Sequence, residues 1–400
     1  MRRYFFFLIM TVVLANCACA QDKNKQAYTD EQLKKDIGEM LLVGFRGTTI
    51  DANSPIMRDI KQYHVGGVII FDYDQPSHKR PRNITSKAQL KKLCHDLQNI
   101  DTTETLLIGI DQEGGMITRL KPEYGFPKFA SAKEMGASDD LVRSTAARTS
   151  KELKELGINL NFAPVVDVNV NPNCPIIGKL NRSFSSDAKR VTKCANIWID
   201  ESIKYGVLSC PKHFPGHGSS KSDTHLGIAD VTPTWKASEL EPYKELVKNT
   251  NVRMIMTTHV FNAHFDSVWP ATLSKSTLTD TLRNGLGYKG LIITDDLAMG
   301  AMVKNYSLDT MIVRTINAGA NMLCLGNNGE KWVDNQVAQV VDIIYKSVKA
   351  GLIKEETIKM SANKIRSTKK WLANPTKTTT TTTKSTTTTT TKSTSQTTKQ

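Results

Sequence analysis

The sequence lacks the short cysteine and histidine motifs that usually mark structural zinc sites and redox proteins. It contains 7 cysteines in 400 residues, but no two form a C-x-x-C pair, and no H-x-H or H-E-x-x-H element occurs. Cys17 and Cys19 fall in an apolar N-terminal segment, which leaves five for the rest of the chain. Because five is odd, we expect at least one free thiol and a fold that needs no disulfide bonds. Cys210 and Cys324 lie in apolar runs and are expected to be buried.

The chain also has no basic stripe interleaved with aromatic residues and no nucleic-acid-binding motif. Its formal net charge is +14. Six of these charges come from Arg2, Arg3 and four lysines between residues 376 and 400, which leaves +8 on the part expected to fold. This excess is modest, so we predict no nucleic-acid partner. We expect basic runs such as 79–82 to lie on solvated faces.

The N-terminal segment has the features of an export signal. Residues 1–20 combine a basic start with an apolar run, and they end in Ala18, Cys19 and Ala20, an A-x-A cleavage pattern. The apolar run is too short to be a membrane-spanning helix. We expect a secreted or periplasmic protein, with lipid anchoring through Cys17 as the alternative, because the residues before Cys17 approximate a lipobox.

The C-terminal segment, residues 374–400, is almost entirely Thr, Ser and Lys. Such a composition offers no apolar side chains to bury, so we expect a disordered tail. With residues 21–35 read as a linker, the folded domain is expected to cover residues 36–373.

Between the two ends, eight short apolar runs alternate with helix-like segments. The runs are typical of buried parallel strands and cover 40–45, 66–71, 106–111, 160–167, 207–214, 254–260, 291–296 and 322–326. Helical patterns occupy 86–100, 139–156, 187–205, 238–248 and 308–318. Eight such units predict an α/β fold of the (β/α)8 TIM-barrel type, with a doubly wound open sheet as the alternative.

Polar residues collect at the ends of these runs, at Asp111, Asp167, Lys212, His213, His259, Asp295 and Asp296. A single aspartate at a strand end is equally well explained as a helix cap. In a (β/α)8 barrel, however, the carboxyl ends of all strands meet at one rim, where the active site lies. Several such residues together therefore predict a site.

Residues 212–225, KHFPGHGSSKSDTH, hold three histidines, two lysines and an aspartate. Proline and glycine prevent a regular element here, so these side chains are expected on a strand end and a loop. Within this loop, Asp223 stands two residues before His225, and a neighbouring carboxylate can raise the pKa of an imidazole and fix its tautomer. His225 is thus a candidate for proton transfer near neutral pH. A solvated surface histidine is the commoner explanation of such a pair.

Asp295, in the segment LIITDDLAMG, emerges from a strand that should be buried on both faces. A carboxylate held there by donors or cations suits a nucleophile. Arg119, Arg182 and Lys212 are available to keep it ionised or to bind ligand hydroxyls. Asp296 is the rival, and we expect it to be a helix cap instead.

The same residue types allow a metal site. His213, His217, His225 and Asp223 are all suitable ligands of a metal-dependent hydrolase. Because no metal motif accompanies them, we favour hydrogen-bonding and loop-structuring roles for His213 and His217, and we predict no metal.

Five segments, taken together, resemble family 3 glycoside hydrolases, and most closely the single-domain β-N-acetylhexosaminidases. They are IDQEGG at 110–115, NFAPVVDV at 161–168, RSFS at 182–185, KHFPGHG followed by DTH within 212–225, and ITDDLAMGA at 293–301. The resemblance covers residues 36–326 in consistent order.

The resemblance implies roles for individual residues. The match to Asp295 is the nucleophile, and the match to His225 is the acid/base, assisted by the match to Asp223. The residues that contact the deepest sugar correspond to Asp111, Arg119, Arg182, Lys212 and His213. It also implies a retaining double displacement without metal or cofactor. The implied reaction is exo-acting removal of terminal β-linked N-acetylglucosamine from oligosaccharides or cell-wall fragments, by what we expect to be a monomer.

Two departures from the family pattern leave alternatives open. Met116 stands where the family usually has an arginine, and the export signal differs from the cytoplasmic role of many relatives. Another sugar specificity, such as that of a β-glucosidase, and phosphorolysis instead of hydrolysis are both open. A non-catalytic sugar-binding barrel is the alternative from a different class.

Overall fold

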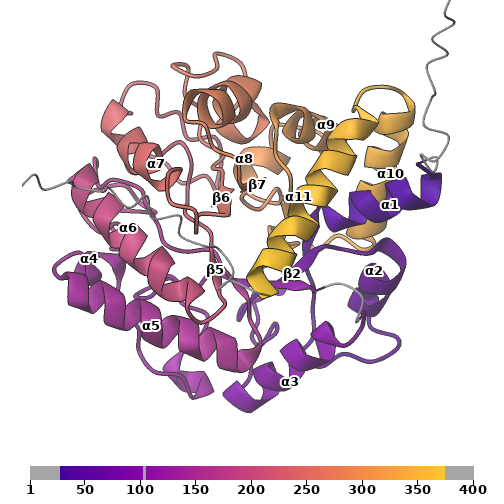
Figure 1. Ribbon diagram of the computed structural model, residues 1–400, viewed down its shortest axis with the longest axis horizontal. Coiled ribbons are helices and arrows are strands. Elements are labelled where there is room, and N and C mark those ends of the chain that lie inside the picture. Colours follow the sequence, from indigo (N-terminus) through magenta and orange to yellow (C-terminus); the bar gives the residue numbers. More distant parts are fainter. Residues whose placement is uncertain (1–27, 102–104, 374–400) are drawn as a thin grey trace, which may run out of the picture.

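The computed structural model describes residues 28–101 and 105–373, so the expected signal peptide and the expected C-terminal tail lie outside the described residues. Eight parallel strands form a central ring that helices surround (Figure 1). The strands are β1 (Leu41–Gly44), β2 (Gly67–Ile70), β3 (Leu107–Ile110), β4 (Leu160–Asn161), β5 (Leu208–Ser209), β6 (Met254–Met256), β7 (Leu291–Ile293) and β8 (Leu323–Leu325). All eight predicted strands are present.

The strand order closes the barrel. Six strands are hydrogen-bonded in the order β5-β4-β3-β2-β1-β8, and β6 pairs with β7. Two parallel bridges, between Phe214 and Thr257 and between Ile293 and Met322, join these two sheets on either side. The prediction of a (β/α)8 barrel is therefore confirmed, and the open-sheet alternative is wrong.

Strands β4 and β5 are much shorter than the eight-residue runs from which they were predicted. Pro164 follows β4 and Pro211 follows β5, and proline has no N–H to donate to a strand ladder. Beyond these prolines the two segments meet again through one bridge, between Val165 and Lys212, where Val166 N donates to the Lys212 carbonyl at 2.8 Å. The polar residues that follow are thus delivered to the rim by irregular but hydrogen-bonded backbone.

The α-helices of the described residues are α1 (Asp30–Glu39), α2 (Pro55–Tyr63), α3 (Lys87–Gln98), α4 (Ala132–Met135), α5 (Asp139–Leu156), α6 (Ala188–Ile203), α7 (Glu241–Leu246), α8 (Gly300–Val303), α9 (Leu308–Ala318), α10 (Gln336–Lys349) and α11 (Glu355–Ala373). The segment between β6 and β7 contains a π-helix, Ser276–Gly285. None of the helices in the described ranges is long and apolar enough to cross a membrane.

Helix α5 shows why local signals predicted these elements well. Ser138 accepts hydrogen bonds from the backbone N–H groups of Asp140 and Leu141, which satisfies donors that the first turn leaves free. Gly157, with φ of 83°, ends the helix in the left-handed conformation that glycine adopts without strain. Cap, acidic first turn and terminal glycine are all readable from sequence, and the predicted range 139–156 matches.

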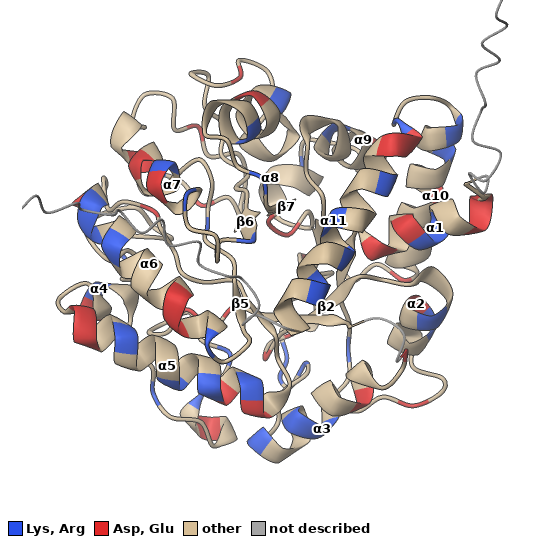
Figure 2. Ribbon diagram, in the orientation of Figure 1, with Lys and Arg blue, Asp and Glu red and all other residues tan. Residues whose placement is uncertain are grey.

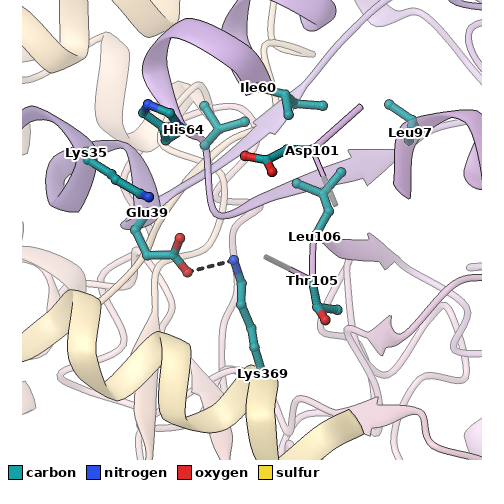
Figure 3. Close-up of a pocket in the computed structure, with 10 residues that line it drawn as sticks. Lys35, Glu39, Ile60, His64, Leu97, Asp101, Thr105, Leu106 and Lys369 are labelled. Atoms are coloured by element: carbon teal, nitrogen blue, oxygen red, sulfur yellow. Dashed lines mark ion pairs between the residues drawn. The ribbon is translucent and has the colours of Figure 1, made fainter. Parts of the chain in front are cut away.

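The N-terminal boundary differs from the expectation, because α1 begins at Asp30, inside the range assigned to a linker. Leu33 and Ile37 are buried, and α1 lies beside α11 (Figure 1). The buried Lys369 on α11 pairs with Glu39 at 2.6 Å, as Figure 3 shows. The cavity beside this pair is only about 20 Å³, too small for a sugar. These residues tie the first and last helices together.

Charged residues of both signs are distributed over the surrounding helices (Figure 2). In contrast, strands β2, β3, β7 and β8 carry no charged or polar side chain apart from Cys324 and are buried. Because the strands are parallel, their carboxyl ends all meet on one rim. The polar residues that follow them are consequently brought together there.

Candidate active site

A cavity of about 480 Å³ opens at the carboxyl ends of the strands. Its walls include Asp111 after β3, Arg119 on the following loop, His225 on the loop after β5, and Asp295 and Asp296 after β7. Residues separated by almost two hundred positions in the chain therefore line one space. Met116, which stands where the family usually has an arginine, is 65% exposed. Arg119, three residues later, lines the cavity.

A cluster of buried charges lies beside the cavity. Lys212 Nζ is 2.7 Å from Asp111 Oδ1 and 2.8 Å from Glu113 Oε1. Arg182 binds Glu113 with two hydrogen bonds, of 2.7 Å from Nε and 2.8 Å from Nη2. Arg119 Nη2 lies 3.4 Å from Asp111 Oδ2. Two carboxylates and three cations are thus interlocked, and we name these five residues the charge cluster.

Electrostatics keep the charge cluster ionised. Burial alone would raise the pKa of Asp111, but the positive charges of Lys212 and Arg119 outweigh it and hold that pKa well below its usual range. Burial likewise opposes the charge on Glu113, and Arg182 and Lys212 lower its pKa to about 2. The cluster therefore presents fixed charged donors and acceptors, which suit the recognition of sugar hydroxyl groups.

His213 is held by a carboxylate that is itself buried. Its Nδ1 lies 2.6 Å from Asp167 Oδ2, and Asp167 Oδ1 also accepts a hydrogen bond of 2.8 Å from the backbone N–H of His217. The other ring nitrogen of His213, Nε2, lies 3.4 Å from Arg182 Nη2. Burial lowers the pKa of His217 to about 4, so that ring is neutral and its Nε2 contacts Thr224 Oγ1.

Asp295 lies where β7 meets the cavity, and its Oδ1 accepts a hydrogen bond of 2.8 Å from the Asp296 N–H. Burial would raise its pKa, but the nearby imidazoles of His213 and His259 and the charge of Lys212 lower it below its ordinary value. Asp295 is therefore a carboxylate at neutral pH, as a nucleophile must be.

Asp296 is not the helix cap that the sequence suggested. Its Oδ1 accepts hydrogen bonds of 3.0 Å from both Ala298 N and Gly326 N, so it joins the loop after β7 to the end of β8. Helix α8 begins later and has Met299 at its cap position. Burial raises the pKa of Asp296 to about 6. The two adjacent aspartates thus have different environments, and Asp295 is the more acidic.

His225 and Asp223 form a close pair on the loop after β5. Asp223 Oδ1 lies 2.7 Å from His225 Nδ1 and accepts a hydrogen bond of 2.8 Å from the His225 backbone N–H. Desolvation lowers the pKa of His225, but the hydrogen bond and charge of Asp223 more than offset it, so the pKa lies above its ordinary value. The pair fixes the tautomer and leaves Nε2 to exchange a proton with a ligand.

Two acidic residues of this region were missed by sequence reasoning about the site. Glu113 lies inside a quoted motif, but nothing in its spacing shows that it meets Arg182, 69 residues away. Asp72, which is 1% exposed, contacts Lys121 Nζ at 2.6 Å and Arg80 Nε at 3.1 Å and lies 3.8 Å from Arg119 Nη1. Its only sequence signal is its place at the end of β2.

Metal ligation has no support in the positions of these side chains. Over residues 28–101 and 105–373, no group of three or more His, Cys, Asp or Glu side chains is arranged to hold a metal ion. His213 and His225 are paired with different carboxylates, Asp167 and Asp223.

Known proteins share both the sequence pattern and the fold. Residues 32–368 match the glycosyl hydrolase family 3 N terminal domain. The chain is 34% identical to beta-hexosaminidase A of Pseudoalteromonas piscicida over 71% of its length, and 32% identical to a beta-hexosaminidase of Tolumonas auensis over 72%. A glycoside hydrolase family 3 beta-N-acetylglucosaminidase from Paenibacillus superposes with a TM-score of 0.76 at 32% identity, over 85% of this chain.

The relatives are longer than the region that they share with this chain, by different amounts. The matched region is 50% of the Pseudoalteromonas protein, 62% of the Paenibacillus chain and 83% of the Tolumonas protein. The family pattern spans both the strands of the barrel and the loops that carry the site. The chain therefore belongs to glycosyl hydrolase family 3.

Proposed function

We propose that the protein is a retaining, exo-acting β-N-acetylhexosaminidase that removes terminal β-linked N-acetylglucosamine from oligosaccharides or cell-wall fragments. The observation that carries this proposal is the presence, in one cavity, of an ionised carboxylate and an imidazole of raised pKa: Asp295 and His225. The printed names of the relatives support the choice of N-acetylhexosamine as substrate.

In the first step of the proposed reaction, Asp295 attacks the anomeric carbon while His225 Nε2–H gives its proton to the departing glycosidic oxygen. A covalent glycosyl-enzyme forms as the aglycone leaves. In the second step His225 removes a proton from water, which displaces Asp295 from the anomeric carbon. Each step inverts the configuration, so the β configuration is retained.

The remaining site residues would bind the sugar. Asp111 and Arg119 of the charge cluster line the cavity, while Lys212, Arg182 and His213 are buried. Lys212, Arg182 and Arg119 would donate to sugar hydroxyls, and Asp111 would accept from them.

We also propose export of the protein as a monomer, cleaved after Ala20, with a lipid anchor at Cys17 as the alternative. The proposed cleavage and the lipid-anchor alternative both rest on the sequence of residues 1–20 alone. Mass spectrometry of the N-terminal peptide from secreted protein separates the two, because lipidation adds acyl chains to a new N-terminal cysteine.

Turnover of aryl glycosides tests the catalytic proposal. We expect release of the phenol from p-nitrophenyl N-acetyl-β-glucosaminide and much slower release from the matching β-glucoside. Adding inorganic phosphate should change neither the rate nor the product, whereas a sugar phosphate product would mean phosphorolysis. Absence of turnover in a folded preparation would favour the sugar-binding alternative.

The variant His225→Ala tests the mechanism. A p-nitrophenyl leaving group needs little proton donation, so its glycosyl-enzyme should accumulate and azide should rescue turnover. A disaccharide has a sugar as its leaving group, which is a poor one, so the rate of its hydrolysis should fall about 10² to 10⁴-fold. The rescued product should be the β-azide, and an α-azide would contradict the double displacement.

A further inference from the structure

The loop that carries His225 is hydrogen-bonded directly to the segment that carries Asp295. Gly300 N donates to the His225 carbonyl at 3.2 Å, and Ala301 N donates to the Thr224 carbonyl at 3.0 Å. Gly300 and Ala301 form the start of α8, five and six residues after Asp295. The first N–H groups of a helix have no partner inside it, and here the carbonyls of Thr224 and His225 supply partners. We call residues 224–226 the histidine loop.

Gly300 makes this contact possible by having no side chain. A Cβ atom built on Gly300 would lie 2.4 Å from the His225 carbonyl oxygen and 3.1 Å from the Leu226 carbonyl carbon. Both atoms are backbone atoms, which a rotamer change cannot move aside. The φ angle of Gly300 lies outside the left-handed region, so space rather than backbone conformation requires glycine.

Besides the contacts with α8, the loop is held at Thr224, which is 1% exposed and whose Oγ1 lies 3.2 Å from His217 Nε2, whereas the two residues that follow have few contacts. The side chain of His225 is 61% exposed and Leu226 is 72% exposed, so burial contributes little. Lys304 Nζ reaches the Leu226 carbonyl at 3.3 Å and pairs with Glu330 at 2.7 Å. Exposed ion pairs of this kind contribute about 0 to 1 kcal/mol. The backbone contact with α8 is what joins Thr224 and His225 directly to the segment that carries Asp295.

We propose that Gly300 is a positioning residue for the reaction: it lets residues 224–226 dock on α8 and so fixes the acid/base His225 relative to the nucleophile Asp295. The inference rests on the proposed function for its kinetic consequence only. The docking itself is a property of the fold and is measurable without a substrate.

The kinetic test compares Gly300→Ala with Gly227→Ala. Displacing a catalytic group by about 1 Å costs on the order of 10²-fold. Gly300→Ala should therefore lose about 10²-fold on a disaccharide, far less on a dinitrophenyl glycoside, and respond to azide as His225→Ala does. Gly227 is the matched control, because a Cβ there meets nothing within 4 Å, and its variant should stay within about twofold of wild type. A merely structural defect would instead lower the rate of hydrolysis of all substrates by the same factor.

Hydrogen exchange tests the docking independently of activity. In the wild-type protein, the amides of Gly300 and Ala301 should exchange slowly although they open a helix, and in Gly300→Ala the Ala301 amide should exchange faster. Fast exchange at both amides in the wild type overturns the proposal, even if Gly300→Ala does not fold. So does equal loss on good and poor leaving groups, or equal loss in the Gly227 control. If the wild type shows protection but no turnover, the proposed function fails and the docking stands.

Discussion

Replacing Glu113 by glutamine tests the charge cluster most directly. The Glu113 side chain is only 5% exposed, and its oxygens lie 2.7 to 2.8 Å from donors of Arg182 and Lys212. Glutamine has nearly the same shape, and its one oxygen can still accept a hydrogen bond. The substitution therefore removes mainly the negative charge that lies between two buried cations.

The expected loss of stability follows from the pKa of Glu113. Although burial alone would raise it, Arg182 and Lys212 lower this pKa from 4.5 to about 2. A shift of this size corresponds to about 3 kcal/mol. Removing one partner of a buried ion pair costs about 3 to 5 kcal/mol, which agrees. We expect the free energy of unfolding to fall by about 3 kcal/mol at pH 7, and KM to rise because Lys212 and Arg182 lose their alignment.

The pH dependence has a definite sign. Because folding lowers the pKa of Glu113, its contribution is complete above about pH 4.5 and is lost as the pH falls toward 2. Urea unfolding followed by circular dichroism at pH 7 and pH 3 should thus show a smaller difference between wild type and variant at pH 3.

The matched control is Glu245→Gln, which breaks a surface pair with Lys248 whose side chains are 56% and 67% exposed. Such pairs contribute about 0 to 1 kcal/mol. If Glu113→Gln costs no more than this control, or if its effect grows as the pH falls, the reasoning about the charge cluster is wrong.

Three further variants test the catalytic assignments. Asp295→Ala should reduce turnover on the order of 10⁴ to 10⁶-fold while binding of an unreactive sugar, measured by calorimetry, survives. Asp296→Asn should cost about tenfold at most, because an amide oxygen can still accept the hydrogen bonds that join the two loops, and a reversed ranking would exchange the roles of the two residues. Asp223→Asn removes the charge that raises the pKa of His225, so the basic limb of the kcat/KM profile should move to lower pH. An unchanged limb would mean that the imidazole does not depend on Asp223.

The barrel could be predicted because its signals are local. Each strand is a short apolar run, and helices such as α5 carry their cap and their terminal glycine in the sequence. The count of eight units favoured a closed barrel over an open sheet, and the bridges that join β6 and β7 to the other strands show the closure. The lengths of β4 and β5 depend on prolines, whose effect on a ladder the apolar pattern alone does not reveal.

The partners of the site residues could not be predicted in the same way. Residue types at strand ends indicated Asp111, Lys212 and Asp295, since parallel strands bring their carboxyl ends to one rim. That Arg182 binds Glu113, or that Asp296 accepts from Gly326, depends on side-chain directions across the barrel. No spacing in a single sequence encodes these contacts.

The proposed use of histidine as the proton donor is consistent with where His225 lies. A carboxylic acid works as a general acid near neutral pH only if burial raises its pKa, as it does for Asp296. The proposed donor lies on a loop and contacts Asp223, whose hydrogen bond and charge outweigh the effect of desolvation on its pKa. An imidazole already titrates near pH 6.5 and needs only a neighbouring carboxylate, Asp223, to remain protonated at slightly higher pH. An exposed acid/base also depends on its backbone for position, which gives the contact at Gly300 its importance.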